Sequence, residues 1–208
     1  MKKIAITQRL ISNQNYFEIR EGLDIKWGKL LKKSNFIPII LPIEFDFKKY
    51  FESIKIDGIL LTGGNDTNIM KSNELSLRRD IFEKKLIKYA IKNHIPILGV
   101  CRGMQIIAEY FGASFKKVKG QISIRHRLKI NKKSKYFNEL KKISSVNSFH
   151  NYAIDILPKN LIVSATNPDG MIKSIEHKKY KIFGQMWHTE RENYFKDSQI
   201  NLIKKIFK

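Results

Sequence analysis

The single cysteine of the chain lies at a predicted strand-to-helix junction, where a thiol can act as a nucleophile. Residues 95–100 form an apolar run that predicts a short buried strand, and a helical pattern resumes at Met104. Gly99 and Gly103 flank Cys101 and remove the Cβ atoms that would clash at a sharp turn. The N–H groups and positive dipole end of the following helix favour a thiolate there. The pattern indicates a nucleophile elbow, with a buried structural cysteine as the alternative.

A catalytic thiolate needs a base within hydrogen-bond reach, and that base needs a carboxylate to orient it. Among the five histidines, His188 follows a predicted strand over residues 181–186 and precedes Glu190 by two positions. If the backbone stays extended through Thr189, the two side chains fall on the same side. His188 is therefore the predicted base and Glu190 the group that holds its tautomer. His150 remains a candidate for ligand contact, and the other three histidines have no orienting group in the sequence.

A carbonyl attacked by a thiolate becomes an oxyanion, and the sequence offers donors for it. Thr62-Gly63-Gly64 ends a predicted strand over residues 58–62, and glycine allows backbone N–H groups to approach a substrate closely. Together with the N–H of Arg102, the N–H of Gly64 would make a two-donor oxyanion hole. Losing one such donor typically costs about 3 kcal/mol of transition-state stabilisation. A plain glycine turn at a strand end is the alternative.

Strand and helix patterns alternate through the first half of the chain, and shorter strands with polar alternation fill the second half. The predicted strands of the first half cover residues 4–7, 36–41, 58–62 and 95–100, with helices at 24–33 and 76–93. The second half has predicted strands at 122–124, 128–130, 161–166, 171–176 and 181–186 and a helix at 198–207. We expect an α/β fold in which flanking helices cover a doubly wound, mostly parallel central sheet with an antiparallel extension. Residues 1–208 are predicted to form one domain.

The long helix over residues 76–93 has an amphipathic pattern. Its buried face is predicted to carry Ile81, Leu86, Ile87, Tyr89 and Ala90. Glu83 is expected to be solvated, with contact to a substrate ammonium group as the alternative.

The chain carries a net charge of +21, but its lysines are spread along the sequence, mostly in pairs at predicted helix ends and loops. No helix-turn-helix, zinc-finger or RNP-like motif accompanies the charge, so nucleic acid is not an expected partner. A polyanionic small substrate fits the charge through electrostatic steering. One cysteine excludes a disulfide framework and a Cys-rich metal site, and no metal or cofactor is expected. The sequence contains no signal peptide or membrane-length apolar run, which favours a cytoplasmic protein without a membrane partner.

Four motifs occur in an order and at a spacing that resemble class I glutamine amidotransferases, and within them the γ-glutamyl hydrolase branch. They are Thr62-Gly63-Gly64, Gly99-Val100-Cys101-Arg102-Gly103-Met104-Gln105, Val146-Asn147-Ser148-Phe149-His150 and Gly184-Gln185-Met186-Trp187-His188-Thr189-Glu190. The resemblance covers essentially the whole chain. It implies a flavodoxin-like sheet, a cofactor-free Cys-His-Glu triad and cleavage of a γ-glutamyl–nitrogen bond through a thioester.

The resemblance also implies roles for individual residues. Cys101 would be the nucleophile, His188 the base and acid, and Glu190 its orienting group, with Gly64 and Arg102 as oxyanion donors. The residues implied to hold the glutamyl head group are Gln105, Asn147, Ser148, Phe149 and His150. The cations expected near the leaving group are Arg9, Arg125 and Arg127, with solvation at the surface as the alternative.

Within the branch, the resemblance favours an anionic, nucleotide-linked substrate. It implies cleavage of a γ-glutamyl group from the phosphoramidate nitrogen of a cytidine diphosphate, for the phosphoramidate of a bacterial capsule. Two positions depart from the usual pattern. Thr189 replaces the proline of His-Pro-Glu and keeps the spacing, whereas Asn151 replaces a histidine that often follows His150, which bears on the substrate.

The alternatives within enzymes are a γ-glutamyl amine hydrolase and a glutaminase subunit that passes ammonia to a partner synthase. A catalytically silent binding protein and a nucleic-acid-binding module are the alternatives from other classes. A homodimer is also expected.

Overall fold

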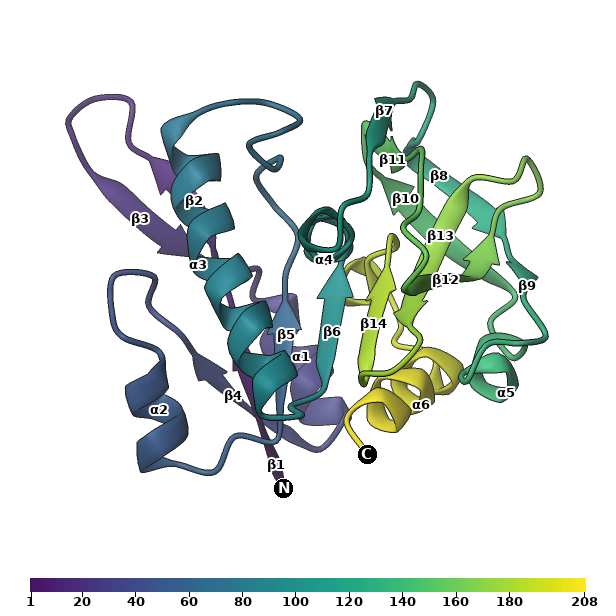
Figure 1. Ribbon diagram of the computed structural model, residues 1–208, viewed down its shortest axis with the longest axis horizontal. Coiled ribbons are helices and arrows are strands. Elements are labelled where there is room, and N and C mark those ends of the chain that lie inside the picture. The colour runs from purple at the N-terminus through teal and green to yellow at the C-terminus, as the bar shows by residue number, and fades with distance from the viewer.

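The central feature of the computed structural model, which describes residues 1–208, is one eight-stranded sheet (Figure 1). Its strands, in spatial order, are β4 (Phe36–Ile40), β1 (Lys2–Ile6), β5 (Gly58–Leu61), β6 (Ile97–Val100), β14 (Ile182–Gln185), β13 (Ile172–His177), β12 (Leu161–Thr166) and β9 (Lys129–Ile130). The strands from β4 to β14 pair in parallel, and those from β14 to β9 pair antiparallel. The predicted fold, a mostly parallel sheet with an antiparallel extension, is confirmed.

Helices cover the parallel part of the sheet, whose strands β5 and β6 are buried at every residue and so on both faces. The helices are α1 (Lys26–Lys33), α2 (Lys48–Ser53), α3 (Glu74–Lys92), α4 (Arg102–Tyr110), α5 (Phe137–Leu140) and α6 (Asp197–Ile206). Helices α3 and α4 contact each other, and α3 lies in front of the sheet in Figure 1 while α1 lies behind it. The chain moves outward in opposite directions from β1 and β5, so right-handed crossovers place their helices on opposite faces.

Three two-stranded sheets border the main one, and the sequence patterns missed most of their strands. They pair β8 (Ile122–Arg127) with β10 (Ser145–Phe149), β7 (Phe115–Lys117) with β11 (Tyr152–Ile154), and β2 (Arg9–Ser12) with β3 (Ile19–Gly22). These strands are short, and β2, β7 and β8 are largely exposed, so they lack the apolar runs by which buried strands are recognised.

The predicted buried face of α3 is wrong in two places. Ile81 is exposed, whereas Glu83, which we expected to be solvated, is fully buried together with Arg79 and Asp80. The face of α3 that packs inward therefore carries charged residues at helical spacing. A prediction that counts only apolar residues places the buried face about one residue away from where it lies.

Candidate active site

Cys101 lies at the sharp turn between β6 and α4 that the flanking glycines predicted. Its backbone has φ 54° and ψ −104°, a conformation that costs a non-glycine residue energy and clusters at functional sites. A Cβ at Gly99 would lie 2.4 Å from the Gly103 carbonyl oxygen, and one at Gly103 would lie 2.1 Å from that of Leu61. Only glycines allow α4 to begin this close to β5 and β6, and this contact holds the thiol at the end of the strand.

His188 and Cys101 both lie against Gly63. A Cβ on Gly63 would sit 2.8 Å from the His188 Cε1 atom and 3.7 Å from the Cys101 Cβ atom. Gly63 therefore leaves space for the His188 imidazole beside the Cys101 thiol. The His188 Nε2 atom is buried and has no hydrogen-bond partner within the protein, so it is available to accept or donate a proton during catalysis.

The other ring nitrogen of His188 is bound to Glu190, with Nδ1 and Oε1 2.5 Å apart. The expected contact is present, but the reason given for it is wrong. Residues Thr189–Arg191 form a 3-10 turn instead of an extended segment, closed by the Arg191 N–H donating to the His188 carbonyl. The turn, not strand alternation, brings the carboxylate back to the ring. The Thr189 hydroxyl, which a proline would lack, accepts a hydrogen bond from Gln185 Nε2 at 3.0 Å.

The charge on His188 is set by two neighbours. Burial alone would lower the pKa of this imidazole, but the negative charges of Cys101 and Glu190 outweigh it and raise the pKa to about 9. At neutral pH the ring is therefore an imidazolium, which can donate a proton from Nε2.

The expected oxyanion donors, Gly64 and Arg102, lie at the carboxyl ends of the adjacent strands β5 and β6. Gly64 has φ +122°, which disfavours any other residue, and its N–H donates no hydrogen bond within the chain. Arg102 begins α4, so its N–H is among those that a helix leaves without an internal partner.

The Arg102 side chain points away from these donors into a buried charge network. It pairs with Asp80 and Glu83, and Arg79 pairs with Glu83 at 3.0 Å. Arg79 also donates to the carbonyl oxygens of Thr62 at 2.8 Å and Gly63 at 2.9 Å. One set of buried ion pairs thus ties the glycine turn to the start of α4.

The network explains why Glu83 is buried and ionised. Burial alone would raise its pKa, but Arg102 and Arg79 outweigh burial and hold the pKa below its usual value. The Thr7 hydroxyl donates to the same carboxylate at 2.8 Å. Glu83 therefore supports the site from behind and is fully occupied by contacts within the protein.

Asn147, predicted to hold the glutamyl group, instead holds His188. Its side-chain amide donates to the His188 carbonyl at 2.7 Å and accepts from the His188 N–H at 2.8 Å. Its Nδ2 also donates to Glu192. These bonds pin the backbone that carries the imidazole, and the expected role of Asn147 as a head-group contact stays a prediction.

Other predicted head-group residues do border the nucleophile. The Phe149 carbonyl oxygen lies 4.0 Å from Cys101 Sγ, and its ring meets the His188 ring edge-on with centroids 6.0 Å apart. Gln105 is buried on the first turns of α4 and donates to the Tyr152 carbonyl at 3.2 Å. Asn151, one of the two departures from the usual motifs, is exposed.

Sequence reasoning missed Lys173, which lies on β13 and is 1% exposed. Its Nζ contacts His150 Nε2 at 3.0 Å, Gln121 Oε1 at 3.0 Å and the hydroxyl of Ser148, a predicted head-group residue, at 3.3 Å. The sequence carried no signal for it, because a lysine in a strand usually faces solvent.

The three predicted leaving-group arginines occupy different surroundings. Arg9 lies beside the glycine turn, because a Cβ on Gly64 would be 2.7 Å from the Arg9 Cβ. Arg125 forms a two-pronged ion pair with Glu192 at 3.0 and 3.1 Å, and Arg127 is exposed without a side-chain partner. The structure therefore brings only Arg9 to the turn.

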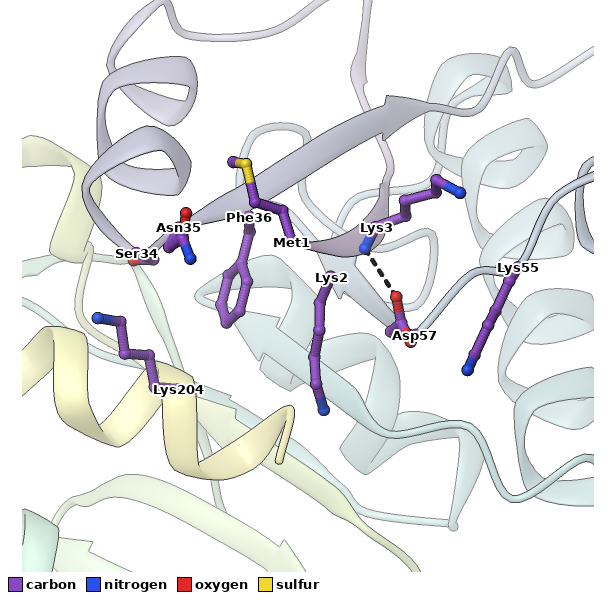
Figure 2. Close-up of a pocket in the computed structure, with 9 residues that line it drawn as sticks. All are labelled: Met1, Lys2, Lys3, Ser34, Asn35, Phe36, Lys55, Asp57 and Lys204. Atoms are coloured by element: carbon purple, nitrogen blue, oxygen red, sulfur yellow. Dashed lines mark hydrogen bonds between the residues drawn. The ribbon is translucent and has the colours of Figure 1, made fainter.

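A basic pocket of about 580 Å³ lies elsewhere (Figure 2). Its lysines include Lys2, Lys3 and Lys55, and the Lys3 N–H donates to Asp57 at 2.8 Å. Because β1 begins at Lys2 while Cys101 follows the carboxyl end of β6, this pocket lies at the amino ends of the parallel strands, opposite the end that carries Cys101.

The side chains of the chain form no group of three or more His, Cys, Asp or Glu that could hold a metal ion. None of its helices combines the length and the apolar character needed to span a membrane.

The family model described as peptidase C26 matches residues 4–190, which is most of the chain. The chain belongs to the peptidase C26 family. Within curated proteins it is 42% identical over 200 residues to the γ-glutamyl-CDP-amidate hydrolase of Campylobacter jejuni, covering 95% of this chain and 94% of that protein. The predicted γ-glutamyl hydrolase resemblance is confirmed.

Two solved structures share the fold of this C26 member. A Thermoplasma acidophilum protein aligns with a TM-score of 0.74 at 24% identity, covering 100% of this chain and 94% of that one. A Thermotoga maritima glutamine amidotransferase aligns with a TM-score of 0.68 at 18% identity, covering 98% and 83%. At these identities the likeness establishes the fold alone.

Proposed function

We propose that this protein is a cysteine hydrolase that cleaves the γ-glutamyl–nitrogen bond of a γ-glutamyl-CDP-amidate, releasing glutamate and CDP-amidate. The observation that carries the proposal is the buried His188, held by Glu190 on Nδ1, with an unpartnered Nε2 beside Cys101. The extensive identity to a hydrolase of that name supports the substrate.

The chemistry proceeds by acyl transfer. The Cys101 thiolate adds to the γ-carbonyl carbon, and the resulting oxyanion accepts hydrogen bonds from the N–H groups of Gly64 and Arg102. The His188 imidazolium gives its Nε2 proton to the departing nitrogen, the carbon–nitrogen bond breaks, and a γ-glutamyl thioester remains. Neutral His188 then takes a proton from water, which attacks the thioester and releases glutamate and the thiolate.

Glu190 acts on both steps through the imidazole. Its carboxylate fixes the tautomer in which Nδ1 carries hydrogen, and its charge stabilises the imidazolium. The roles of Asn147 and of the buried Glu83 network are to position these groups, since neither has a free polar atom directed at Cys101. The mechanism requires no metal or cofactor. The expected homodimer and cytoplasmic location stay predictions.

Release of glutamate by the purified protein alone tests the proposal. The substrates are γ-glutamyl-CDP-amidate, glutamine and γ-glutamyl amines, each with the wild type and with Cys101→Ala. We expect turnover largely confined to the nucleotide substrate and lost in the variant. Preference for γ-glutamyl amines would assign it to amine catabolism, and turnover only with an added synthase would make it an amidotransferase subunit.

A further inference from the structure

Arg191 is an exposed cation that the 3-10 turn after His188 brings to the reacting groups. Side chains three residues apart in such a turn lie on the same side, and Arg191 comes three residues after His188. Both side chains meet one ring, because the centroid of Phe149 lies 5.0 Å from the Arg191 Cζ atom and 6.0 Å from the centroid of the His188 ring. The turn that returns Glu190 to the imidazole therefore also directs a guanidinium to the residue beside Cys101.

The guanidinium of Arg191 is free to bind a ligand. Its side chain is 40% exposed, and none of its side-chain N–H groups donates a hydrogen bond within the protein. Glu190 supplies a nearby opposite charge, but its Oε1 lies 3.9 Å from Arg191 Nε, too far for a hydrogen bond, and is already bound to His188. The Phe149 ring restrains the guanidinium, because a cation is attracted to the face of an aromatic ring. Arg191 thus presents unused donors to solvent beside the site.

The place of the leaving group follows from the reaction. The His188 Nε2 atom gives its proton to the departing nitrogen, so that nitrogen must lie within hydrogen-bond reach of the imidazole. In a γ-glutamyl-CDP-amidate this nitrogen is bonded directly to phosphorus, which puts anionic phosphate oxygens beside the imidazole as well. A cation next to His188 is therefore placed for the diphosphate, whereas the α-carboxylate lies at the far end of the glutamyl chain.

Two of the arginines expected near the leaving group are less well placed for this contact. Arg9 adjoins Gly64, whose N–H is assigned to the oxyanion and not to the departing nitrogen. Arg125 donates from both of its Nη atoms to Glu192, which already neutralises it. Arg191 combines free donors with a position beside the imidazole.

We propose that Arg191 binds the diphosphate of the leaving group and determines the preference for an anionic nucleotide substrate. This inference rests on the proposed function, since it assigns part of the same substrate. A guanidinium presents its N–H groups as a planar fork that matches two phosphate oxygens, and such charge-assisted pairs are stronger than neutral hydrogen bonds. The phosphate keeps its charge throughout the reaction, so the contact acts mainly on substrate binding.

Two substrates distinguish the diphosphate from the α-carboxylate. γ-Glutamyl p-nitroanilide carries the α-carboxylate on an uncharged leaving group, and γ-glutamyl-CDP-amidate carries both anions. Steady-state kinetics compare the wild type with Arg191→Met and with Arg78→Met, a matched control whose side chain is 43% exposed and pairs with Glu74 on α3. We expect Arg191→Met to lower kcat/KM for the nucleotide by about 10- to 100-fold, mainly through KM, and to leave the p-nitroanilide within about twofold of the wild type.

A third variant separates charge from geometry. Arg191→Lys keeps the cation but loses the fork, so it should recover part of the loss on the nucleotide. A loss on the p-nitroanilide as large as that on the nucleotide would mean that Arg191 supports the triad through Glu190, and would overturn the inference. Wild-type kinetics of Arg191→Met on the nucleotide would overturn it too.

Binding measurements keep the test independent of turnover. Calorimetric titration with CDP and with L-glutamate is made on the wild type, Arg191→Met and Arg78→Met. The inference requires CDP to bind the wild type and Arg78→Met alike, and to bind Arg191→Met about 10- to 100-fold more weakly. It is refuted if CDP does not bind the wild type, if CDP binds Arg191→Met equally well, or if only L-glutamate binding is weakened.

The inference and the proposed function can fail separately. A wild type that binds CDP through Arg191 but cleaves no γ-glutamyl substrate would refute the proposed function alone. A wild type that cleaves γ-glutamyl-CDP-amidate no better than Arg191→Met does would refute the inference alone.

Discussion

The parallel half of the sheet and its antiparallel extension treat buried charge in opposite ways. Behind the glycine turn, the cations of Arg79 and Arg102 are matched by Asp80 and Glu83. In the extension, the Lys173 cation is surrounded by neutral groups. The first network is neutralised within itself and holds backbone in place, whereas the charge of Lys173 is balanced only from outside its hydrogen-bond partners, by Cys101 and Asp169. The difference teaches that the parallel half builds a self-contained support, while the buried charge of the extension depends on its neighbours, the nucleophile among them.

Replacing the nucleophile should have the largest effect. Cys101→Ala removes the atom that forms the thioester, and we expect kcat to fall by at least about 10⁴-fold. The fold should survive, because a smaller side chain is accommodated at the turn. Glutamate release and thermal unfolding together check this, and activity within tenfold of the wild type would place the reaction elsewhere.

The carboxylate beside His188 should matter next. Cys101 and, to a smaller extent, Glu190 raise the pKa of His188 to about 9, so Glu190→Gln should lower that pKa and reduce kcat by about 10²- to 10⁴-fold. A raised histidine pKa means that the imidazolium, and the stability it gives, persists until the pH rises through about 9. NMR titration of labelled histidine measures the shift. The exposed Glu52→Gln is the control, and an unchanged His188 pKa in Glu190→Gln would contradict the role.

The matched network of the parallel half can be broken at its centre. Glu83→Gln leaves Arg79 and Arg102 without a shared counter-charge, and we expect the free energy of unfolding to fall by about 3–5 kcal/mol. Glu74→Gln on the same helix removes an exposed pair with Arg78 and should cost at most about 0.5 kcal/mol. Denaturant unfolding compares the two. Equal stabilities would show that the network holds nothing in place.

A smaller contrast lies within the extension. Arg125 pairs with Glu192, which also accepts from Asn147, the residue that pins His188, while Arg127 has no partner. Because Arg125 is partly exposed, Arg125→Met should cost about 0.5–1 kcal/mol of stability with a modest loss of kcat, and Arg127→Met should change neither. If Arg127→Met instead raised KM for the nucleotide substrate more than Arg125→Met does, Arg127 would be a leaving-group contact.

The sequence predicted the parts of the site that depend on local geometry. The elbow at Cys101 follows from an apolar strand, two glycines and a helix, and all of these signals lie within one short segment. The strands β5 and β6 could also be predicted, because strands buried on both faces are written as continuous apolar runs. The contact between His188 and Glu190 was also expected, although a 3-10 turn produces it.

Contacts between distant segments could not be read in this way. Glu83, Arg79 and Arg102 come together only when α3 packs beside α4, and a charged residue on a helix usually faces solvent. Lys173 is buried against Gln121, Ser148 and His150, which lie far from it in the sequence. The resemblance implied that Asn147 holds the substrate, and no sequence pattern shows that its amide bonds the His188 backbone.

The central claim is that Cys101 carries the glutamyl group during turnover. Mass spectrometry of the acid-quenched reaction with γ-glutamyl-CDP-amidate, followed by peptide mapping, tests it directly. We predict an adduct of one glutamyl group on the peptide that contains Cys101, absent from Cys101→Ala. Sustained turnover by Cys101→Ala, or a glutamyl adduct on any other residue, would contradict the account.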